Sequence, residues 1–236
     1  MNTIGISSNC LMKYPLFDAL EEISCLTNFV EIMSACGHSL PEFLEAAESF
    51  PLRYSVHSPT SDGNIPEPTE KIRKASLSVI YESAEAADIL GAETLVIHPG
   101  FCLEKEMFEK SYEALLLSIS DLGRMQDEFS VRFAVENLGS WDCCHFRYPD
   151  FVPILREAGL AFCLDVGHAN LNSALDLFMD SKPEHVHLHD NHGVWDEHAA
   201  LGSGDIDFSK VMMLDAVGIV ECMEYEAVLE SLEYLK

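Results

Sequence analysis

Histidine, aspartate and glutamate recur where short apolar runs of this chain end. His98, Glu136 and Asp165 each directly follow three apolar residues. The same residue types recur in further runs: His57 closes one, His187 lies within one and Glu221 lies near the end of another. Imidazole and carboxylate together suit Zn, Mn, Fe or Co better than Ca or Mg. Several carboxylates in one cavity would repel one another and take up protons unless a cation lay among them. The residues therefore predict a divalent-metal site, provided that the fold brings these run ends together.

Two later segments add side chains of the same chemistry. His168 lies three residues after Asp165, and Asp196 and His198 share one loop. His189 is a candidate for binding substrate. We expect the remaining histidines of the apolar segments at the surface or in contacts behind the ligands, namely His38, His145 and His185.

Two tryptophans lie in loops that follow apolar runs. Trp141 and Trp195 could form the apolar walls of a site for a sugar. Packing within the loops explains them equally well, so the sequence leaves both interpretations open.

The elements that must position these residues alternate along the chain. Runs rich in Val, Ile, Phe and Leu predict strands at 4–8, 29–33, 54–58, 94–98, 132–137, 161–167, 185–190 and 218–222. Helical spacing predicts helices over 70–90, 107–125 and 225–235, and a helix start at Ser39–Glu42. Eight strands that alternate with helices predict one (β/α)8 TIM-barrel domain over residues 1–236, in which all strand C-termini meet at one mouth. No G-x-G-x-x-G follows the first strand, which disfavours an open doubly wound sheet.

Charge restricts the partners of the protein. The 236 residues include 40 acidic and 14 basic ones, a net charge of −26. Nucleic acid and anionic membranes both require clustered Lys and Arg, and the expected mouth loops offer only Lys13, Lys105 and Arg147. We therefore expect a small-molecule substrate, no nucleic acid and no membrane. Eight cysteines without a C-x-x-C pair favour a reducing, cytoplasmic location, and the sequence leaves a homo-oligomer open.

Several segments together resemble the xylose isomerase-like TIM-barrel superfamily, which covers sugar isomerases, ketose epimerases and endonuclease IV. The similarity rests on short motifs spread over nearly the whole chain: Val135-Glu136-Asn137, Cys163–His168, His187–Asn191, Asp196-Glu197-His198 and Leu201–Phe208. The last three segments match the H-x-x-D-N, D-x-H and G-x-G-x-I-D elements of the superfamily in order.

The resemblance implies a ligand set. Glu136, Asp165, His187 and Glu221 correspond to the four-ligand metal site of the epimerases, although Glu224 lies one turn of chain after Glu221. The remaining candidates correspond to the additional ligands of endonuclease IV: His57, His98, His168, Asp196 and His198. The resemblance thus implies a divalent-metal cofactor of one to three ions.

The resemblance also implies a reaction. It favours a metal-dependent isomerase or epimerase of carbohydrate metabolism that acts on a small sugar or sugar phosphate through an enediolate. Glu136 and Glu221 would be ligand and base together, and His168 and His189 would hold substrate hydroxyls. The chain lacks the arginine that the epimerases place after the seventh strand. An endonuclease IV-like multi-zinc phosphodiesterase is the first alternative, and a metal-binding barrel without turnover is the second.

Overall fold

Parallel strands form a closed barrel in the computed structural model, which describes residue 1 and residues 3–236. The strands are β1 (Thr3–Ser7), β2 (Phe29–Met33), β3 (Arg53–His57), β4 (Thr94–Ile97), β5 (Arg132–Glu136), β6 (Ala161–Asp165), β7 (His185–Leu188) and β8 (Val217–Val220). Each strand pairs with the next in chain order, and β8 pairs with β1 to close the ring. The predicted (β/α)8 barrel is confirmed.

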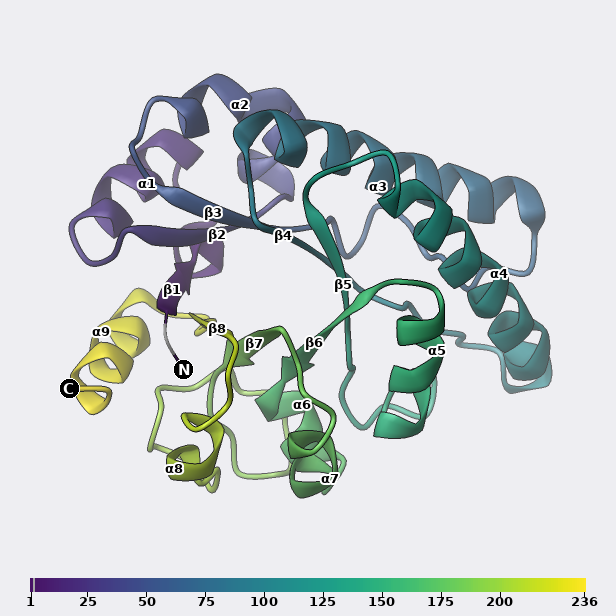
Figure 1. Ribbon diagram of the computed structural model, residues 1–236. Helices are drawn as coiled ribbons and strands as arrows, with labels where there is room; N and C mark the ends of the chain where they lie inside the picture. The colour runs from purple at the N-terminus through teal and green to yellow at the C-terminus, as the bar shows by residue number, and fades with distance from the viewer. Residues whose placement is uncertain (2) are drawn as a thin grey trace.

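Helices surround this ring on the outside (Figure 1). They are α1 (Leu16–Ser24), α2 (Leu40–Glu48), α3 (Glu70–Leu90), α4 (Phe108–Gln126), α5 (Val152–Glu157), α6 (Val166–Leu171), α7 (Leu175–Met179), α8 (Phe208–Val211) and α9 (Tyr225–Tyr234). The helix α3 shows how the sequence sets these bounds: Leu77, Ile80, Ala84 and Ala87 form its buried face, and Gly91 ends it with a φ of +71°.

Side chains of the strands divide between two cores. Phe162 and Leu164 of β6 point outward into the large core under the helices, whereas Cys163 points into the barrel with Val96 and Ala134. The barrel interior is therefore lined by small side chains at one level. Polar side chains occupy the levels towards the mouth, where the strands end.

The structure corrects some details of the sequence prediction. The strand β6 ends at Asp165 rather than Gly167, because the Asp165 carboxylate accepts the His168 backbone N–H and starts α6. Of the three histidines expected at the surface or behind the ligands, His38 and His185 are buried and His145 is partly exposed, and only His185 lies behind a candidate ligand. His38 is fully buried and contacts Ser8, and His185 lies inside the barrel, in contact with the carboxylate of Glu31.

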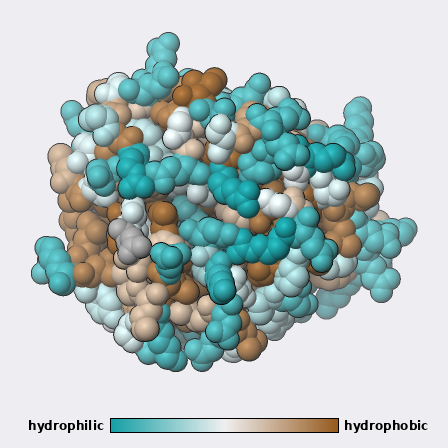
Figure 2. All heavy atoms as spheres, viewed as in Figure 1, coloured by the Kyte–Doolittle hydropathy of each residue, from teal (hydrophilic) through white to brown (hydrophobic). Residues whose placement is uncertain are grey.

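The surface of the protein is largely hydrophilic, as its many charged residues predict. Hydrophilic side chains cover much of the face drawn in Figure 2, with apolar side chains showing between them. Among the described residues, no helix has both the length and the apolar character that a bilayer span requires.

Candidate metal centre

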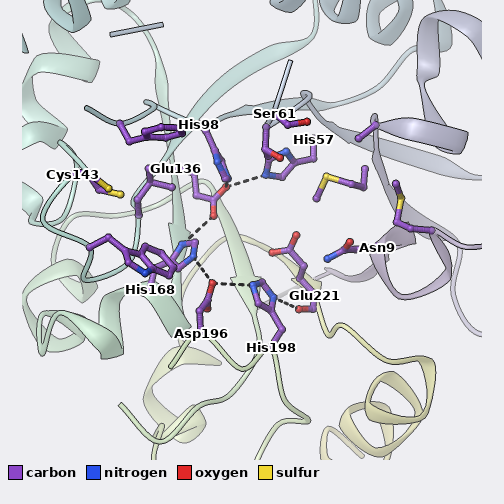
Figure 3. A pocket seen from close by; sticks show the side chains of 18 of the residues that line it. Asn9, His57, Ser61, His98, Glu136, Cys143, His168, Asp196, His198 and Glu221 are labelled. Carbon is purple, nitrogen blue, oxygen red and sulfur yellow. Dashed lines mark hydrogen bonds and ion pairs between the residues drawn. The ribbon is translucent and has the colours of Figure 1, made fainter. Parts of the chain in front are cut away.

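A cavity of about 590 Å³ opens at the C-terminal ends of the strands. This is the end of a barrel where loops build active sites, and the volume is typical of ligand pockets. Its floor consists of candidate metal ligands, which point towards one another in Figure 3. The ligands fall into three donor groups, which we call the first, second and third group.

The first group comes from three neighbouring strands. His57 ends β3, His98 follows β4 and Glu136 ends β5. The Nε2 atoms of both histidines lie 3.1 Å from Oε2 of Glu136, and the three donor atoms lie within 4.8 Å of one another. Three nitrogen and oxygen donors that converge in this way fit a zinc-like ion.

The second group lies deeper and shares Glu136 with the first. Nδ1 of His187 lies 3.4 Å from Oε1 of Glu136, 3.1 Å from Oε2 of Glu221 and 3.9 Å from Oδ2 of Asp165. Each oxygen of Glu136 therefore faces a different group. Glu221 is almost fully buried in the group, whereas Glu224 is exposed beyond it.

The third group comes from α6 and the loop between β7 and β8. Oδ2 of Asp196 lies 3.2 Å from Nε2 of His168 and 3.3 Å from Nε2 of His198. The structure thus brings together every residue that the sequence predicted as a metal ligand.

Backbone carbonyls fix the tautomers of three of these histidines. The Nδ1 atoms of His57, His168 and His198 donate to the carbonyl oxygens of Ser58, Asn137 and Glu221, at 2.8, 2.9 and 2.8 Å. A carbonyl oxygen only accepts hydrogen bonds, so the proton must be on Nδ1. The lone pair of each Nε2 is then directed at its donor group, which is the arrangement found behind metal-bound histidines.

His187 is oriented in the opposite sense, and by a carboxylate. Its Nε2 lies 2.9 Å from Oε1 of Glu31, a fully buried residue in the middle of β2. The other oxygen of Glu31 accepts from Nε2 of His185 at 2.7 Å and from the Ser55 hydroxyl at 2.9 Å. Glu31 therefore holds the proton of His187 on Nε2 and leaves Nδ1 free to ligate. Sequence reasoning missed Glu31; the available signal was a charged residue inside the apolar strand Phe29–Met33.

Asp165 is held in the same manner. Nε2 of His189 lies 3.0 Å from both carboxylate oxygens of Asp165. The amide of Asn137 exchanges hydrogen bonds with the backbone of Asp165 at 3.0 and 2.9 Å, which fixes the end of β6 against β5. His189 is fully buried.

Asp190 organises the loop that carries two ligands of the third group. Its carboxylate accepts backbone N–H groups of Asn191, Gly202, Gly204 and Ile206 at 2.9 to 3.2 Å. A Cβ on Gly204 would lie 2.4 Å from the carbonyl oxygen of Asn191, so only glycine fits there. Asp190 of the H-x-x-D-N element thus binds the backbone of the G-x-G-x-I-D element and sets the conformation of the loop.

Charge within the centre is strongly coupled. Burial raises the pKa of Glu136, but the imidazoles of His98 and His187 outweigh burial and hold the pKa well below its ordinary value. Burial lowers the pKa of His198, but Asp196 and Glu221 raise it to about 9. Without an ion, protons on the histidines balance the carboxylates, so ion binding must release protons.

Of Trp141, Trp195 and His189, all predicted substrate contacts, one lines the cavity and two do not. Trp141 lines the cavity, 6.1 Å from His168 between ring centroids. Trp195 is 73% exposed and His189 lies behind Asp165, and neither is among the residues that line the cavity. Of the described residues that do line it, none is Lys or Arg.

Sequence comparison identifies the family of the chain. A model of the xylose isomerase-like TIM-barrel family matches residues 22–233. The chain is 34% identical to the uncharacterized protein MJ1614 of Methanocaldococcus jannaschii, over 92% of this chain and 91% of that protein. It is 26% identical to a probable endonuclease 4 of Mycobacterium leprae, over 64% of each chain.

Solved structures give the same fold. A D-tagatose 3-epimerase-like protein superposes with a TM-score of 0.88 at 24% identity, over 99% of this chain and 95% of its own. The TTHB071 protein of Thermus thermophilus, soaked with ZnCl2, superposes with a TM-score of 0.76 at 25% identity, over 99% and 96%.

Proposed function

The chain belongs to the xylose isomerase-like TIM-barrel family, and we propose that it is a divalent-metal-dependent hydrolase of a small phosphoester. The observation that carries this proposal is the position of Glu136. One of its carboxylate oxygens faces the first donor group and the other faces the second. A carboxylate shared in this way would help to hold two ions, and two ions would supply stabilisation of the attacking and leaving oxygens of an in-line displacement.

The charge of the centre supports several ions rather than one. Four buried carboxylates, on Glu31, Glu136, Asp165 and Glu221, surround the second group, and Asp196 adds a fifth. With a single divalent ion, protonated histidines would have to balance most of the remaining negative charge. Three divalent ions would carry six positive charges against five, and would leave the floor slightly positive and able to bind an anion. The anionic substrate then needs no Lys or Arg from the cavity wall.

The residues of the chain do the positioning. The carbonyl-fixed imidazoles and Glu136 hold the first and third groups open towards the cavity, while His187, Asp165 and Glu221 close the floor. The mixed nitrogen and oxygen donors fit zinc, and a similar fold has been soaked with zinc.

Metal analysis provides the first test. Protein purified without chelator should contain more than one equivalent of ion, Glu136→Gln should lose at least two, and Asp165→Asn fewer. Glu224→Gln is the matched control, because Glu224 is exposed three residues after a proposed ligand. Equal metal content in all four proteins would refute the assignment.

Turnover provides the second test. The metal-loaded protein is assayed with aryl and alkyl phosphate monoesters and diesters, sugar phosphates and DNA that contains an abasic site. We expect cleavage of a small ester, lost on chelation and in Glu136→Gln. Cleavage confined to abasic DNA would move the proposal to an endonuclease IV-like enzyme, and binding without turnover to a non-catalytic barrel.

A second candidate is the isomerase or epimerase reaction that the sequence favours. The observation in its favour is that Glu221 lines the cavity beside Glu136, so a carboxylate is available at the floor to move a proton of a bound sugar. His168 would then contact a substrate hydroxyl. Incubation of the loaded protein with ketoses, aldoses and their phosphates in deuterated water tests this. Deuterium that enters next to the carbonyl, and not with Glu221→Gln, would favour isomerisation over hydrolysis.

A further inference from the structure

Above the donor groups, the cavity wall consists mainly of hydrocarbon and sulfur. Its apolar side chains come from the end of β2 and from the loops after β1, β2, β4 and β5, and include Met12, Met33, Phe101, Leu103, Leu138 and Trp141. Apart from the ligands, the polar side chains that line the described cavity are Asn9, Thr60 and Ser61. In Figure 3, Asn9 and Cys143 lie on opposite sides of the cavity, so the loops after β1 and β5 face each other across it.

Large apolar side chains at this wall are held open to solvent. Leu103 is 78% exposed, Trp141 47% and Phe101 40%. Exposed apolar groups that cluster around a concave site are typical of a binding surface. They bury their area only when a ligand covers them.

Trp141 is fixed in its place by the backbone. A Cβ on Gly139 would lie 2.4 Å from the indole, so the ring packs directly on the glycine. The ring meets His168 edge to face at 6.1 Å between centroids. An apolar plane thus stands next to the third donor group, where the organic part of a bound ester would lie.

A wall of this kind selects against a polyol. A buried hydroxyl without a partner loses its hydrogen bonds to water, and the wall supplies few polar side chains to replace them. An alkyl or aryl group gains free energy from the same surface.

We propose that the ester group of the substrate is apolar, an alkyl or aryl group that packs against Trp141, Leu103 and Phe101. This inference rests on the proposed function. In the reaction, a water oxygen bonds to phosphorus and the ester P–O bond breaks. One proton of the water leaves with the alcohol R–OH, and phosphate, or a monoester from a diester, remains.

Binding of non-hydrolysable phosphonates tests the inference without turnover. Calorimetry of the metal-loaded protein with methyl-, propyl- and hexylphosphonate should show the affinity rising up to about fourfold for each added methylene, from ~0.8 kcal/mol per buried CH2. A polyhydroxylated alkylphosphonate of the same length as hexylphosphonate should bind no better than methylphosphonate. Equal affinity along the series, no binding at all, or tighter binding of the polyhydroxylated compound would overturn the inference.

A pair of tryptophan variants locates the effect. Trp141→Ala should reduce the affinity for hexylphosphonate by about tenfold or more and change that for methylphosphonate less than twofold. Trp195→Ala is the matched control and should change neither, because Trp195 lies outside the cavity. Equal effects of the two substitutions would contradict the proposed wall.

The two proposals fail separately. A steep phosphonate series without hydrolysis of any ester would refute the hydrolase and retain the apolar subsite. Hydrolysis of sugar phosphates with a flat phosphonate series would retain the hydrolase and refute the apolar subsite.

Discussion

Replacing Glu31 by glutamine tests how the second donor group is built. The carboxylate accepts from Nε2 of His185 and the hydroxyl of Ser55, and its other oxygen lies 2.9 Å from Nε2 of His187. A glutamine amide offers one accepting oxygen and one donating NH2 group in the same space. The NH2 group must then face a donor, and if that donor is His187, its proton moves to Nδ1. The nitrogen that faces Glu136 and Glu221 can no longer ligate.

The size of the effect follows from these contacts. Loss of the group behind a metal-bound histidine typically lowers metal affinity 10- to 100-fold, which corresponds to roughly 1.4–2.7 kcal/mol. The loss should be confined to one ion. His57, His98, His168 and His198 do not contact Glu31 in the described structure, and three of them are held by backbone carbonyls instead.

Competition against a chromophoric chelator measures each affinity, and metal analysis after dialysis gives the stoichiometry. Glu31→Gln should release one ion at a chelator concentration that leaves the others bound. Ser55→Ala is the control, because it removes one hydrogen bond to Glu31 and leaves the imidazole contacts intact. Unchanged affinity in Glu31→Gln, or an equal loss of all ions, would refute the role of Glu31.

Three further outcomes are expected. For Asp121, burial raises the pKa, but hydrogen bonds from Lys74 and Arg73 outweigh it and lower the pKa to about 2. Its contribution to stability is therefore complete above about pH 4 and is lost as the pH falls towards 2. In urea titrations at pH 7, the free energy of unfolding of Asp121→Asn should be roughly 1 kcal/mol lower than that of the wild type, a value discounted for solvent screening. Near pH 2 the two proteins should unfold at the same urea concentration. Asp190→Asn should leave backbone N–H groups without acceptors and lower the free energy of unfolding by roughly 2–4 kcal/mol, which calorimetry measures. The variant should release the ion next to His198 first, which metal analysis would detect. Chelation should lower the melting temperature, and scanning calorimetry that shows no shift would contradict an ion-filled centre.

The sequence predicted the strands and the ligands through one physical regularity. Residues buried on both faces of parallel strands are apolar, so a polar residue at the end of such a run stands out, as Glu136 and Asp165 do. The barrel then places all such ends at one mouth. Glu31 escaped this reasoning because it lies in the middle of β2, where only the three-dimensional pairing reveals that His187 is its neighbour.

Loop residues were less predictable for a different reason. Trp141 and Trp195 both lie in loops after strands, but the ring of Trp141 packs on Gly139 in the cavity, while Trp195 lies exposed on the loop that Asp190 organises. The contacts of Asp190 with Gly202, Gly204 and Ile206 join residues 12 to 16 positions apart, which no local pattern records. His189 was expected inside a strand over 185–190 and in contact with substrate, but β7 ends at Leu188 and the His189 ring contacts Asp165.

The sharing of donors among strands also has a consequence for how the barrel opens. The first group joins β3, β4 and β5, the second joins β5 to β8, and the third ties α6 to the loop before β8. Ions bound at these groups would therefore cross-link the strands along one arc of the ring. The strands β1 and β2 supply none of these ligands, and they enter the ring between β8 and β3. Local unfolding of β1 and β2 would break no contact to an ion, but it would displace Glu31, which lies behind His187.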